Sequence, residues 1–179
     1  MPTFASLHDI LARARHIKLL ALDVDGVLTD GQLYFSNSGE EMKSFSTLDG
    51  QGIKLLQDSG VAVALITARS SQLVSNRAEN LGIRHLVQGS HDKLEALQQL
   101  QTSLGITMAE TAYVGDDLPD LACIRRAGLG ITVPNGHAAI QAQAFCSTVA
   151  AGGRGAVREV CDWIMQARNT YDAAIARFS

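Results

Sequence analysis

Two aspartates at the end of an apolar run are the residues of this sequence best placed to do chemistry. Asp23 and Asp25 follow the run 19–22 and precede Gly26. A continuous apolar run indicates a strand buried on both faces, and both carboxylates would then lie at its carboxyl end, where open α/β sheets bind ligands. Two carboxylates beside a core are costly unless a cation or a reaction needs them. The leading interpretation is a metal-dependent catalytic site.

Three further segments place polar groups at comparable points. Thr67 follows the apolar run 63–66, Asp116 follows a short apolar run after residue 111, and Lys93 begins a helix after a strand and a loop. Acidic residues suit a divalent metal, and a hydroxyl with an ammonium suits an anion. The set therefore favours phosphoryl transfer, which needs charge neutralisation and positioning. Taken alone, Thr67 would equally suit a helix cap and Lys93 a solvated helix surface.

The elements that must position these residues alternate along the chain. Helices are expected near 6–15, 50–58, 71–81, 93–104, 118–126, 137–145 and from 156 onwards. Strands are expected at 17–24, 61–66, 85–87, 112–114, 129–133 and 147–149, with a hairpin formed by 32–35 and 42–45. This alternation predicts an α/β fold: one domain, 1–179, with a doubly wound, Rossmann-like parallel sheet, a β-hairpin insertion and no cap domain. The polar groups would then converge at one edge of the sheet.

Composition agrees with a single-domain enzyme. The chain has 179 residues, is 46% hydrophobic and carries a formal net charge of -3. Its basic residues are scattered, which argues against a nucleic-acid partner. Cys123, Cys146 and Cys161 lack CxxC spacing and predict buried free thiols in a reducing compartment. With no signal-peptide pattern and no run of membrane-spanning length, we expect a cytoplasmic protein without a membrane partner.

Taken in order, the four segments resemble the motifs of the haloacid dehalogenase superfamily of phosphohydrolases. They are Asp23-Val24-Asp25-Gly26-Val27-Leu28-Thr29, Thr67, Lys93 and Gly115-Asp116-Asp117-x-x-Asp120. The resemblance implies that Asp23 is a nucleophile forming an aspartyl-phosphate. It also implies that Asp25 acts first as general acid and then as general base.

The same resemblance implies a Mg²⁺ site. The ion would be held by the Asp23 carboxylate, the main-chain carbonyl of Asp25 and the Asp116 carboxylate. Thr67 and Lys93 would grip the phosphoryl oxygens that are not transferred. Either Asp117 or Asp120 would hold Lys93 or a metal-bound water.

The intervals 24–66 and 68–92 are too short to hold the cap domain that many superfamily members carry. Water must then be excluded in another way, and a neighbouring subunit is the expected one. The hairpin has five large apolar residues, Leu33, Tyr34, Phe35, Met42 and Phe45, more than an isolated ribbon should expose. We therefore expect a homo-oligomer built through the hairpins, with a tetramer as the predicted state.

Within the superfamily, the chain is similar to the family of capless phosphatases that act on 3-deoxy-D-manno-octulosonate 8-phosphate in lipopolysaccharide sugar biosynthesis. Segment 45–54 resembles that family's substrate loop, and segment 152–159 resembles its tail, which reaches towards a neighbour's active site. The implied substrate-binding residues are Asp25, Ser46, Thr47, Leu48, Asp49, Gly50, Lys54, Arg69, Arg77 and Lys93.

Several alternatives stay open on the sequence alone. A phosphatase acting on a nine-carbon keto-sugar acid phosphate would share these features, and a non-catalytic binding module of the same fold is a third possibility. Arg69 and Arg77 would equally suit surface positions. Segment 153–155, Gly-Arg-Gly, is either a flexible connector or a contact to a neighbouring active site.

Overall fold

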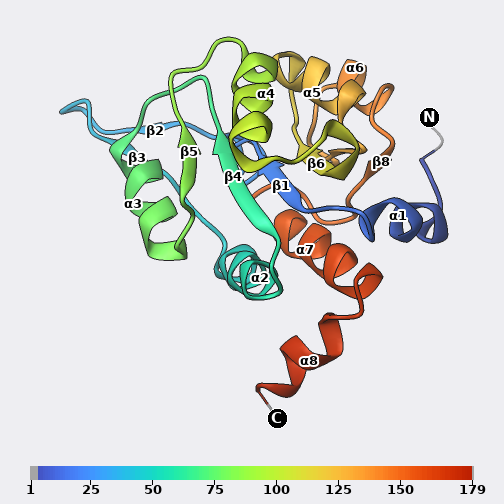
Figure 1. Ribbon diagram of the computed structural model, residues 1–179. Helices are drawn as coiled ribbons and strands as arrows, with labels where there is room; N and C mark the ends of the chain where they lie inside the picture. The colour runs from blue at the N-terminus through green and yellow to red at the C-terminus, as the bar shows by residue number, and fades with distance from the viewer. Residues whose placement is uncertain (1–3, 179) are drawn as a thin grey trace.

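A six-stranded parallel sheet forms the centre of the molecule in the computed structural model, which describes residues 4–178. The strand order is β5-β4-β1-β6-β7-β8, and every pair of neighbours is parallel. The strands are β1 (Leu19–Leu22), β4 (Ala62–Ile66), β5 (His85–Val87), β6 (Thr111–Val114), β7 (Leu129–Thr132) and β8 (Cys146–Ser147). β1 lies between β4 and β6, so the three strands that precede the predicted site residues are immediate neighbours (Figure 1).

Helices cover both faces of this sheet, which confirms the predicted doubly wound fold (Figure 1). One face is covered by α1 (Leu7–Ala14), α2 (Thr47–Asp58), α3 (Gln72–Leu81) and α7 (Ala156–Ala167). The last helix, α8 (Tyr171–Ala176), packs against α7 and extends away from the sheet (Figure 1). The other face is covered by α4 (Lys93–Leu104), α5 (Leu121–Arg126) and α6 (Ala138–Gln141), with the short 3-10 turns η1 (Met108–Glu110) and η2 (Leu118–Asp120) nearby.

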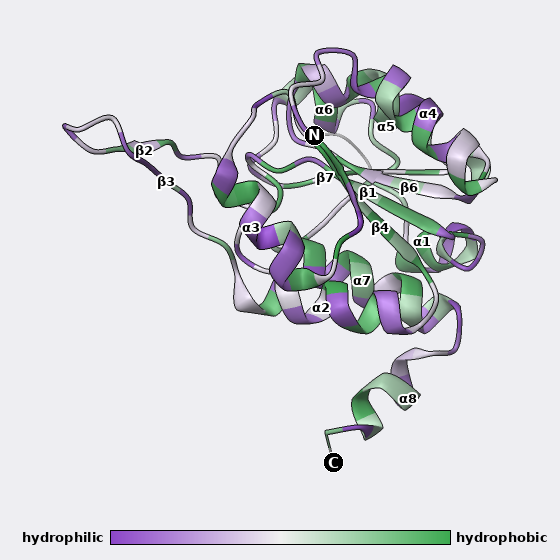
Figure 2. Cartoon of the chain, turned by 60° about the vertical axis from the view of Figure 1, so that its left-hand side comes forward, coloured by the Kyte–Doolittle hydropathy of each residue, from purple (hydrophilic) through white to green (hydrophobic). Residues whose placement is uncertain are grey.

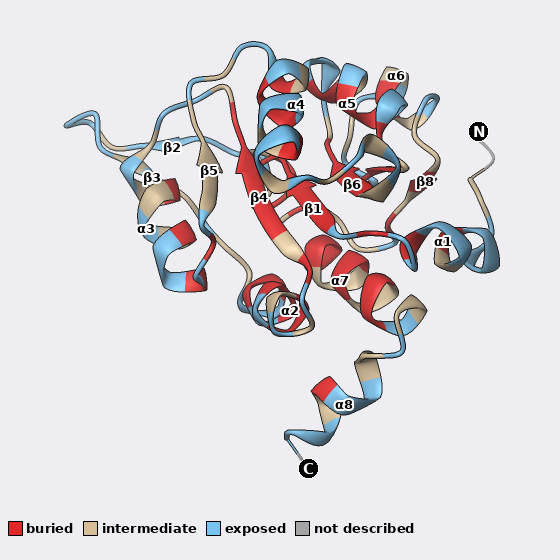
Figure 3. Cartoon of the chain, in the orientation of Figure 1, coloured by how far each residue is buried: buried red, intermediate tan, exposed pale blue. Residues whose placement is uncertain are grey.

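The pattern of β1 explains the two layers. Leu20 and Leu22 pack into the core beneath α1, α2 and α7, whereas Leu19 and Ala21 pack into the core beneath α4 and α5. Successive strand residues point to opposite faces, so a strand covered on both sides is apolar throughout. Figure 3 shows this central strand buried along its length. Within residues 4–178, no helix is both long and apolar enough to cross a membrane.

Several element boundaries differ from the sequence expectation. Helix α2 begins at Thr47 rather than near residue 50, because the Ser46 hydroxyl caps it by accepting from the Asp49 amide at 3.4 Å. The predicted helix 118–126 is divided into η2 and α5, and the predicted helix 137–145 shortens to α6. Strand β8 is Cys146–Ser147 rather than 147–149, and just beyond it the amides of Val149 and Ala150 both donate to the Glu159 carboxylate, each at 3.0 Å.

The hairpin is separate from the main sheet and projects from the body (Figure 2). Its strands β2 (Tyr34–Phe35) and β3 (Glu41–Met42) are antiparallel, with Tyr34 opposite Met42. Between β1 and β4 the chain holds only this hairpin and α2, and between β4 and α4 only α3 and β5. Phe35 and Met42 are 60% and 59% exposed, so the hairpin presents apolar surface to solvent.

The three cysteines are buried and free, as predicted. Burial raises the pKa of Cys123 and of Cys146 to about 12. These thiols therefore stay protonated at neutral pH and serve as small apolar packing groups.

Candidate active site

The turn after β1 is shaped by hydrogen bonds within the motif that carries both aspartates. The carbonyl of Val24 accepts from the amides of Leu28 and Thr29, both at 3.0 Å. The Thr29 hydroxyl oxygen accepts from the Gly26 amide at 3.3 Å. Gly26 has φ +93°, and a Cβ there would lie 2.0 Å from the Asp116 carboxylate. Only glycine combines this backbone conformation with so close an approach.

The carboxyl edges of β1 and β6 bring three carboxylates together. Oxygens of Asp23, Asp116 and Asp120 all lie within 4.8 Å of one another. Asp23 is 6% exposed and Asp120 is fully buried. The structure thus unites the two carboxylates predicted to hold a metal and adds Asp120 beside them.

Asp120 is committed to protein partners. One carboxylate oxygen accepts from the Lys93 ammonium and from the Tyr113 hydroxyl, each at 2.7 Å. The other accepts from the Asp116 amide at 3.1 Å. Asp117 is exposed and its carboxylate accepts from the Leu118 amide at 2.8 Å, as a cap of η2. Of the two aspartates left open by the sequence, Asp120 is therefore the one that holds Lys93.

Lys93 lies between two carboxylates, with its ammonium 2.8 Å from Asp23 and 2.7 Å from Asp120. It begins α4, whose N-cap Asp92 accepts from the Glu95 amide at 2.9 Å. Burial alone would lower the pKa of Lys93, but the attraction of the two carboxylates raises it. Lys93 is therefore a permanent cation at the site.

The acidic cluster carries more negative charge than Lys93 neutralises. Burial, followed by repulsion from Asp120, raises the pKa of Asp116 to about 6. The same two causes raise the pKa of Asp23 well above its ordinary value, against the pull of Lys93. A divalent cation between Asp23 and Asp116 would relieve this repulsion, and oxygen ligands suit Mg²⁺. The residues present fit such an ion.

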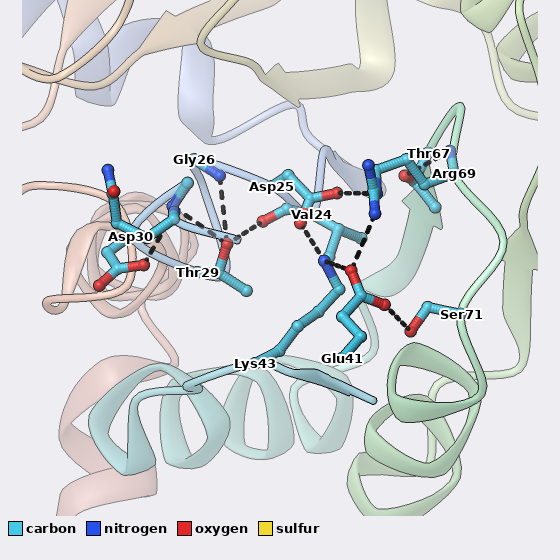
Figure 4. A network of polar contacts seen from close by, with 12 residues as sticks. Val24, Asp25, Gly26, Thr29, Asp30, Glu41, Lys43, Thr67, Arg69 and Ser71 are labelled. Carbon is cyan, nitrogen blue, oxygen red and sulfur yellow. Dashed lines mark hydrogen bonds and ion pairs between the residues drawn. The ribbon is translucent and has the colours of Figure 1, made fainter. Parts of the chain in front are cut away.

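The side chain of Asp25 lies in a second group of charges, formed with the base of the hairpin (Figure 4). One carboxylate oxygen contacts the Lys43 ammonium, and the other lies 3.8 Å from Nε of Arg69. Glu41 accepts from Arg69 at 2.9 Å and from the Ser71 hydroxyl at 3.2 Å. Its carboxylate also lies 3.3 Å from Lys43.

Sequence reasoning did not find Glu41 and Lys43. The only sequence signal is alternation: two charged residues flank Met42, the first residue of the predicted hairpin strand 42–45, so in an extended chain their side chains share one face. A polar face on an edge ribbon is ordinarily solvated, and the sequence does not show that this one docks on Asp25.

Thr67 follows β4 and is 2% exposed. Its amide donates to the Val87 carbonyl at 2.9 Å, and its hydroxyl oxygen accepts from the Arg69 amide at 3.2 Å. That bond uses a lone pair of the oxygen, so the hydroxyl hydrogen is still able to donate. Thr67 follows the carboxyl end of β4 and Arg69 lies beside Asp25, so both residues are at the edge of the sheet where they were predicted.

The predicted substrate loop 45–54 is corrected by the structure, because most of it is the start of α2. Asp49 is fully buried and accepts from the amides of Arg158 at 2.8 Å and Gly155 at 3.4 Å. It therefore caps α7 rather than facing a ligand. Gly50 is also buried, and a Cβ there would lie 2.5 Å from the Arg77 guanidinium.

Arg77 and Lys54 are also placed differently from the expectation. Arg77 donates to the Ser46 carbonyl at 3.0 Å and lies over the Phe45 ring, so it supports the start of α2. Lys54 lines a cavity of about 750 Å³ together with Val63 and residues at the start of β5. That cavity lies at the amino edge of the sheet, opposite the aspartates, so within this chain Lys54 is remote from the site.

The remaining loop residues line a smaller groove of about 420 Å³ beside the site. Its lining consists of Asp30, Ser44, Phe45, Ser46, Thr47, Leu48, Gly153 and Arg154. Arg154 is exposed and its guanidinium is 4.0 Å from Asp30. Of the predicted substrate contacts, Ser46, Thr47 and Leu48 thus face a groove in the described part of the chain.

Asn135 is a further residue that the sequence analysis missed. Its amide nitrogen donates to the Gly26 carbonyl at 3.0 Å, and its amide oxygen accepts from the Gly152 amide at 2.8 Å. It ties the turn after Asp25 to the loop before α7. The sequence around it is typical only of a turn, so no signal there indicated this role.

Comparison with known proteins gives consistent matches. A family model for haloacid dehalogenase-like hydrolases matches residues 83–159, which include Lys93, Asp116 and Asp120. The 3-deoxy-D-manno-octulosonate 8-phosphate phosphatase of Escherichia coli (strain K12) is 46% identical over 166 residues, which are 93% of this chain and 88% of the relative.

Solved structures agree. A 3-deoxy-D-manno-octulosonate 8-phosphate phosphatase from Moraxella catarrhalis, in complex with magnesium ion, phosphate ion and KDO molecule, is 49% identical with a TM-score of 0.95, covering 97% of this chain and 100% of that one. The cobalt-bound form of the deoxy-D-mannose-octulosonate 8-phosphate phosphatase from Haemophilus influenzae is 37% identical with a TM-score of 0.86, covering 90% and 94%.

Proposed function

The chain belongs to the 3-deoxy-D-manno-octulosonate 8-phosphate phosphatase family of haloacid dehalogenase-like hydrolases, and we propose that it hydrolyses this sugar-acid phosphate through an aspartyl-phosphate on Asp23. The observation that carries the proposal is the cluster of buried Asp23, Lys93 and Asp120 with the half-buried Asp116 at the carboxyl edge of the central strands. The excess negative charge of the carboxylates suits a metal ion, and the fixed ammonium of Lys93 suits an oxygen of a phosphoryl group.

In the first step, a carboxylate oxygen of Asp23 attacks phosphorus and forms the acyl-phosphate bond. The bond from phosphorus to the sugar oxygen breaks, and its electron pair stays on that oxygen, which takes a proton from Asp25. Lys93 is already held 2.8 Å from Asp23, where it neutralises charge on the phosphoryl oxygens. Thr67 supplies a hydroxyl donor to the same group.

In the second step, Asp25 takes a proton from water as the water oxygen attacks phosphorus. The bond between Asp23 and phosphorus breaks, and its electrons restore the carboxylate. Asp120 acts through Lys93 alone, because its oxygens are occupied by protein donors. The second step leaves Asp25 protonated again, as the first step of the next turnover requires.

We expect Mg²⁺ to be held by the carboxylates of Asp23 and Asp116 and by the main-chain carbonyl of Asp25. When bound, it would neutralise phosphoryl charge and align the phosphorus with Asp23. The fit of the acidic cluster supports this, as does the magnesium ion in the Moraxella catarrhalis structure.

The substrate proposal rests on the relatives and on the cations at this edge. The Moraxella catarrhalis enzyme was solved with a KDO molecule, and Arg69 provides a partly exposed guanidinium beside Asp25 that suits a carboxylate. The pathway would then be lipopolysaccharide sugar biosynthesis in the cytoplasm. A nine-carbon keto-sugar acid phosphate is the second candidate, because the same cations would receive it.

We also propose that the functional unit is a homotetramer assembled through the hairpins. Exposed apolar side chains on the hairpin support this, namely Leu33, Tyr34, Phe35 and Met42. A neighbouring copy would also supply the cover that the capless site lacks, and segment 153–155 is the candidate for reaching across.

A phosphate-release screen with Mg²⁺ tests the activity. Sugar phosphates of eight and nine carbons and 4-nitrophenyl phosphate would be compared for the wild type, Asp23→Asn and the control Asp58→Asn, which removes an exposed carboxylate at the amino edge. We expect preference for the eight-carbon acid, no release by Asp23→Asn and normal release by the control. Equal turnover by Asp23→Asn would remove the nucleophile assignment, and an inactive wild type would favour a binding module.

A further inference from the structure

The base of the hairpin places a buried ammonium directly on the carboxylate that is assigned the acid and base role. The Lys43 side chain is only 1% exposed, although it follows a ribbon whose strands are otherwise open to solvent. Burying an unpaired ammonium is costly, and the cost is offset here by contacts with Asp25 and Glu41. A lysine so placed is an element of the site.

We propose that Lys43 is a positioning residue: it holds the Asp25 carboxylate in the orientation that faces the leaving oxygen of the substrate. The inference rests on the proposed function, because it concerns the residue that transfers the proton. It adds to that function a contribution from the hairpin of the same chain, which none of the four motifs contains.

The geometry gives Asp25 two separate supports. Lys43 contacts one carboxylate oxygen, and the Arg69 guanidinium lies 3.8 Å from the other (Figure 4). Two contacts on different oxygens fix the plane of the carboxylate, which a single contact would not do. The supports come from different elements, the hairpin and the loop after β4, so their spacing sets the position of Asp25.

Glu41 keeps both cations in place. Its carboxylate accepts from Arg69 at 2.9 Å and lies 3.3 Å from Lys43. The Ser71 hydroxyl donates to its other oxygen at 3.2 Å. Glu41 and Lys43 lie two residues apart, so both turn inward while Met42 between them is 59% exposed. The alternation of side chains along the ribbon therefore places both Glu41 and Lys43 on the face that contacts Asp25 and Arg69.

The proton that Asp25 transfers matters most when the leaving oxygen is strongly basic. A 4-nitrophenolate leaves without protonation, whereas a phenolate or an alkoxide needs the proton as the bond to phosphorus breaks. If Lys43 orients Asp25, its loss should be felt in proportion to leaving-group basicity. A general loss of structure or of phosphate binding would lower all rates alike.

The test measures kcat/KM for a series from phenyl phosphate to 4-nitrophenyl phosphate. These substrates lack a carboxylate, so sugar recognition does not enter. The value of kcat/KM reports steps only up to release of the phenol, so the later hydrolysis of the acyl-phosphate is excluded. General acid catalysis contributes about 10²–10⁴-fold. We expect Lys43→Met to lower kcat/KM about 10- to 100-fold with phenyl phosphate and less than about threefold with 4-nitrophenyl phosphate.

Two variants serve as controls for this test. Lys43→Arg keeps the charge and should restore most of the phenyl phosphate rate. Lys18→Met removes an exposed ammonium that pairs with Glu110 at the opposite edge of the sheet, and should leave the series unchanged. Equal loss across the series for Lys43→Met, or no loss, would overturn the inference.

The design separates the inference from the proposed function. A wild type that releases no phosphate, or an active Asp23→Asn, refutes the proposed function itself. If Lys43→Met shows no cooperative thermal transition, Glu41→Gln takes its place, because it removes a partner of Lys43 and keeps the side-chain shape. A steeper dependence on leaving-group basicity in Glu41→Gln supports the inference, and an unchanged dependence overturns it.

Discussion

Replacing Asp116 by asparagine should make the metal-free protein more stable, although the residue belongs to the proposed metal site. Burial and the nearby Asp120 raise the pKa of Asp116 from 3.8 to about 6. The folded state therefore holds this proton more tightly than the unfolded chain does. The contribution of Asp116 to the stability of the metal-free protein then falls as pH rises from about 4 to about 6, and its full cost is present above pH 6.

The size of the effect follows from the shift. A displacement of about two pKa units corresponds to ~3 kcal/mol at pH 7. Asparagine has nearly the same shape and keeps the close approach to Gly26, so Asp116→Asn should recover most of this free energy. Mg²⁺ should reverse the order, because it stabilises the wild type by binding the native state and has little affinity for the variant.

Urea unfolding at pH 7 tests both the stability difference without metal and its reversal by Mg²⁺. In EDTA, Asp116→Asn should unfold at a higher midpoint than the wild type, and the difference should vanish near pH 4. In millimolar Mg²⁺, the wild type should gain stability and Asp116→Asn should not. Asp58→Asn is the matched control, because it removes an exposed carboxylate at the amino edge of the sheet, away from Asp116. A metal-free variant no more stable than the wild type at pH 7 would refute the reasoning.

Further predictions concern the turn, the corrected loop residues and the hairpin. Gly26→Ala should lose activity and at least about 2 kcal/mol of stability, because its Cβ would strike Asp116; a normal denaturation midpoint would contradict this. Asp49→Ala should cost about 1–2 kcal/mol in urea unfolding, since it removes the cap of α7, with KM for the sugar phosphate nearly unchanged. Lys54→Met should leave kcat and KM as they are, and a raised KM would show that a neighbouring copy uses this residue. Phe35→Ser should shift the assembly to smaller species in light scattering, and an unchanged mass would exclude the hairpin as the interface.

Much of the site was predictable because strand patterns decide where strand ends lie. Apolar runs before Asp23, Thr67 and Asp116 identify neighbouring buried strands, and parallel strands bring their carboxyl ends to one edge. No knowledge of side-chain packing was needed for that step. The family resemblance implied that Asp117 or Asp120 would hold Lys93 or a metal-bound water, but the choice between the two aspartates depended on which one faces inward.

What the sequence did not predict depends on how separate elements dock. The sequence around Asp49 resembles a substrate loop, yet Asp49 caps α7, which follows more than 100 positions later in the chain. Lys54 lies further along α2, which runs back towards the amino edge, so a rise of about 1.5 Å per residue carries it away from the site. Lys43 is buried only because the hairpin folds onto Asp25. These three placements depend on contacts between elements that are distant in the sequence, so no local hydrophobic pattern indicates them.

The inward and outward alternation of the hairpin limits how its length can change. Removing one residue between Ser38 and Glu41 would turn both charges to solvent and set the apolar Met42 against Asp25, because a one-residue slip exchanges the two faces of a strand. Removing or inserting two residues would keep the faces. Natural variation and engineered shortening of this ribbon should therefore proceed in steps of two.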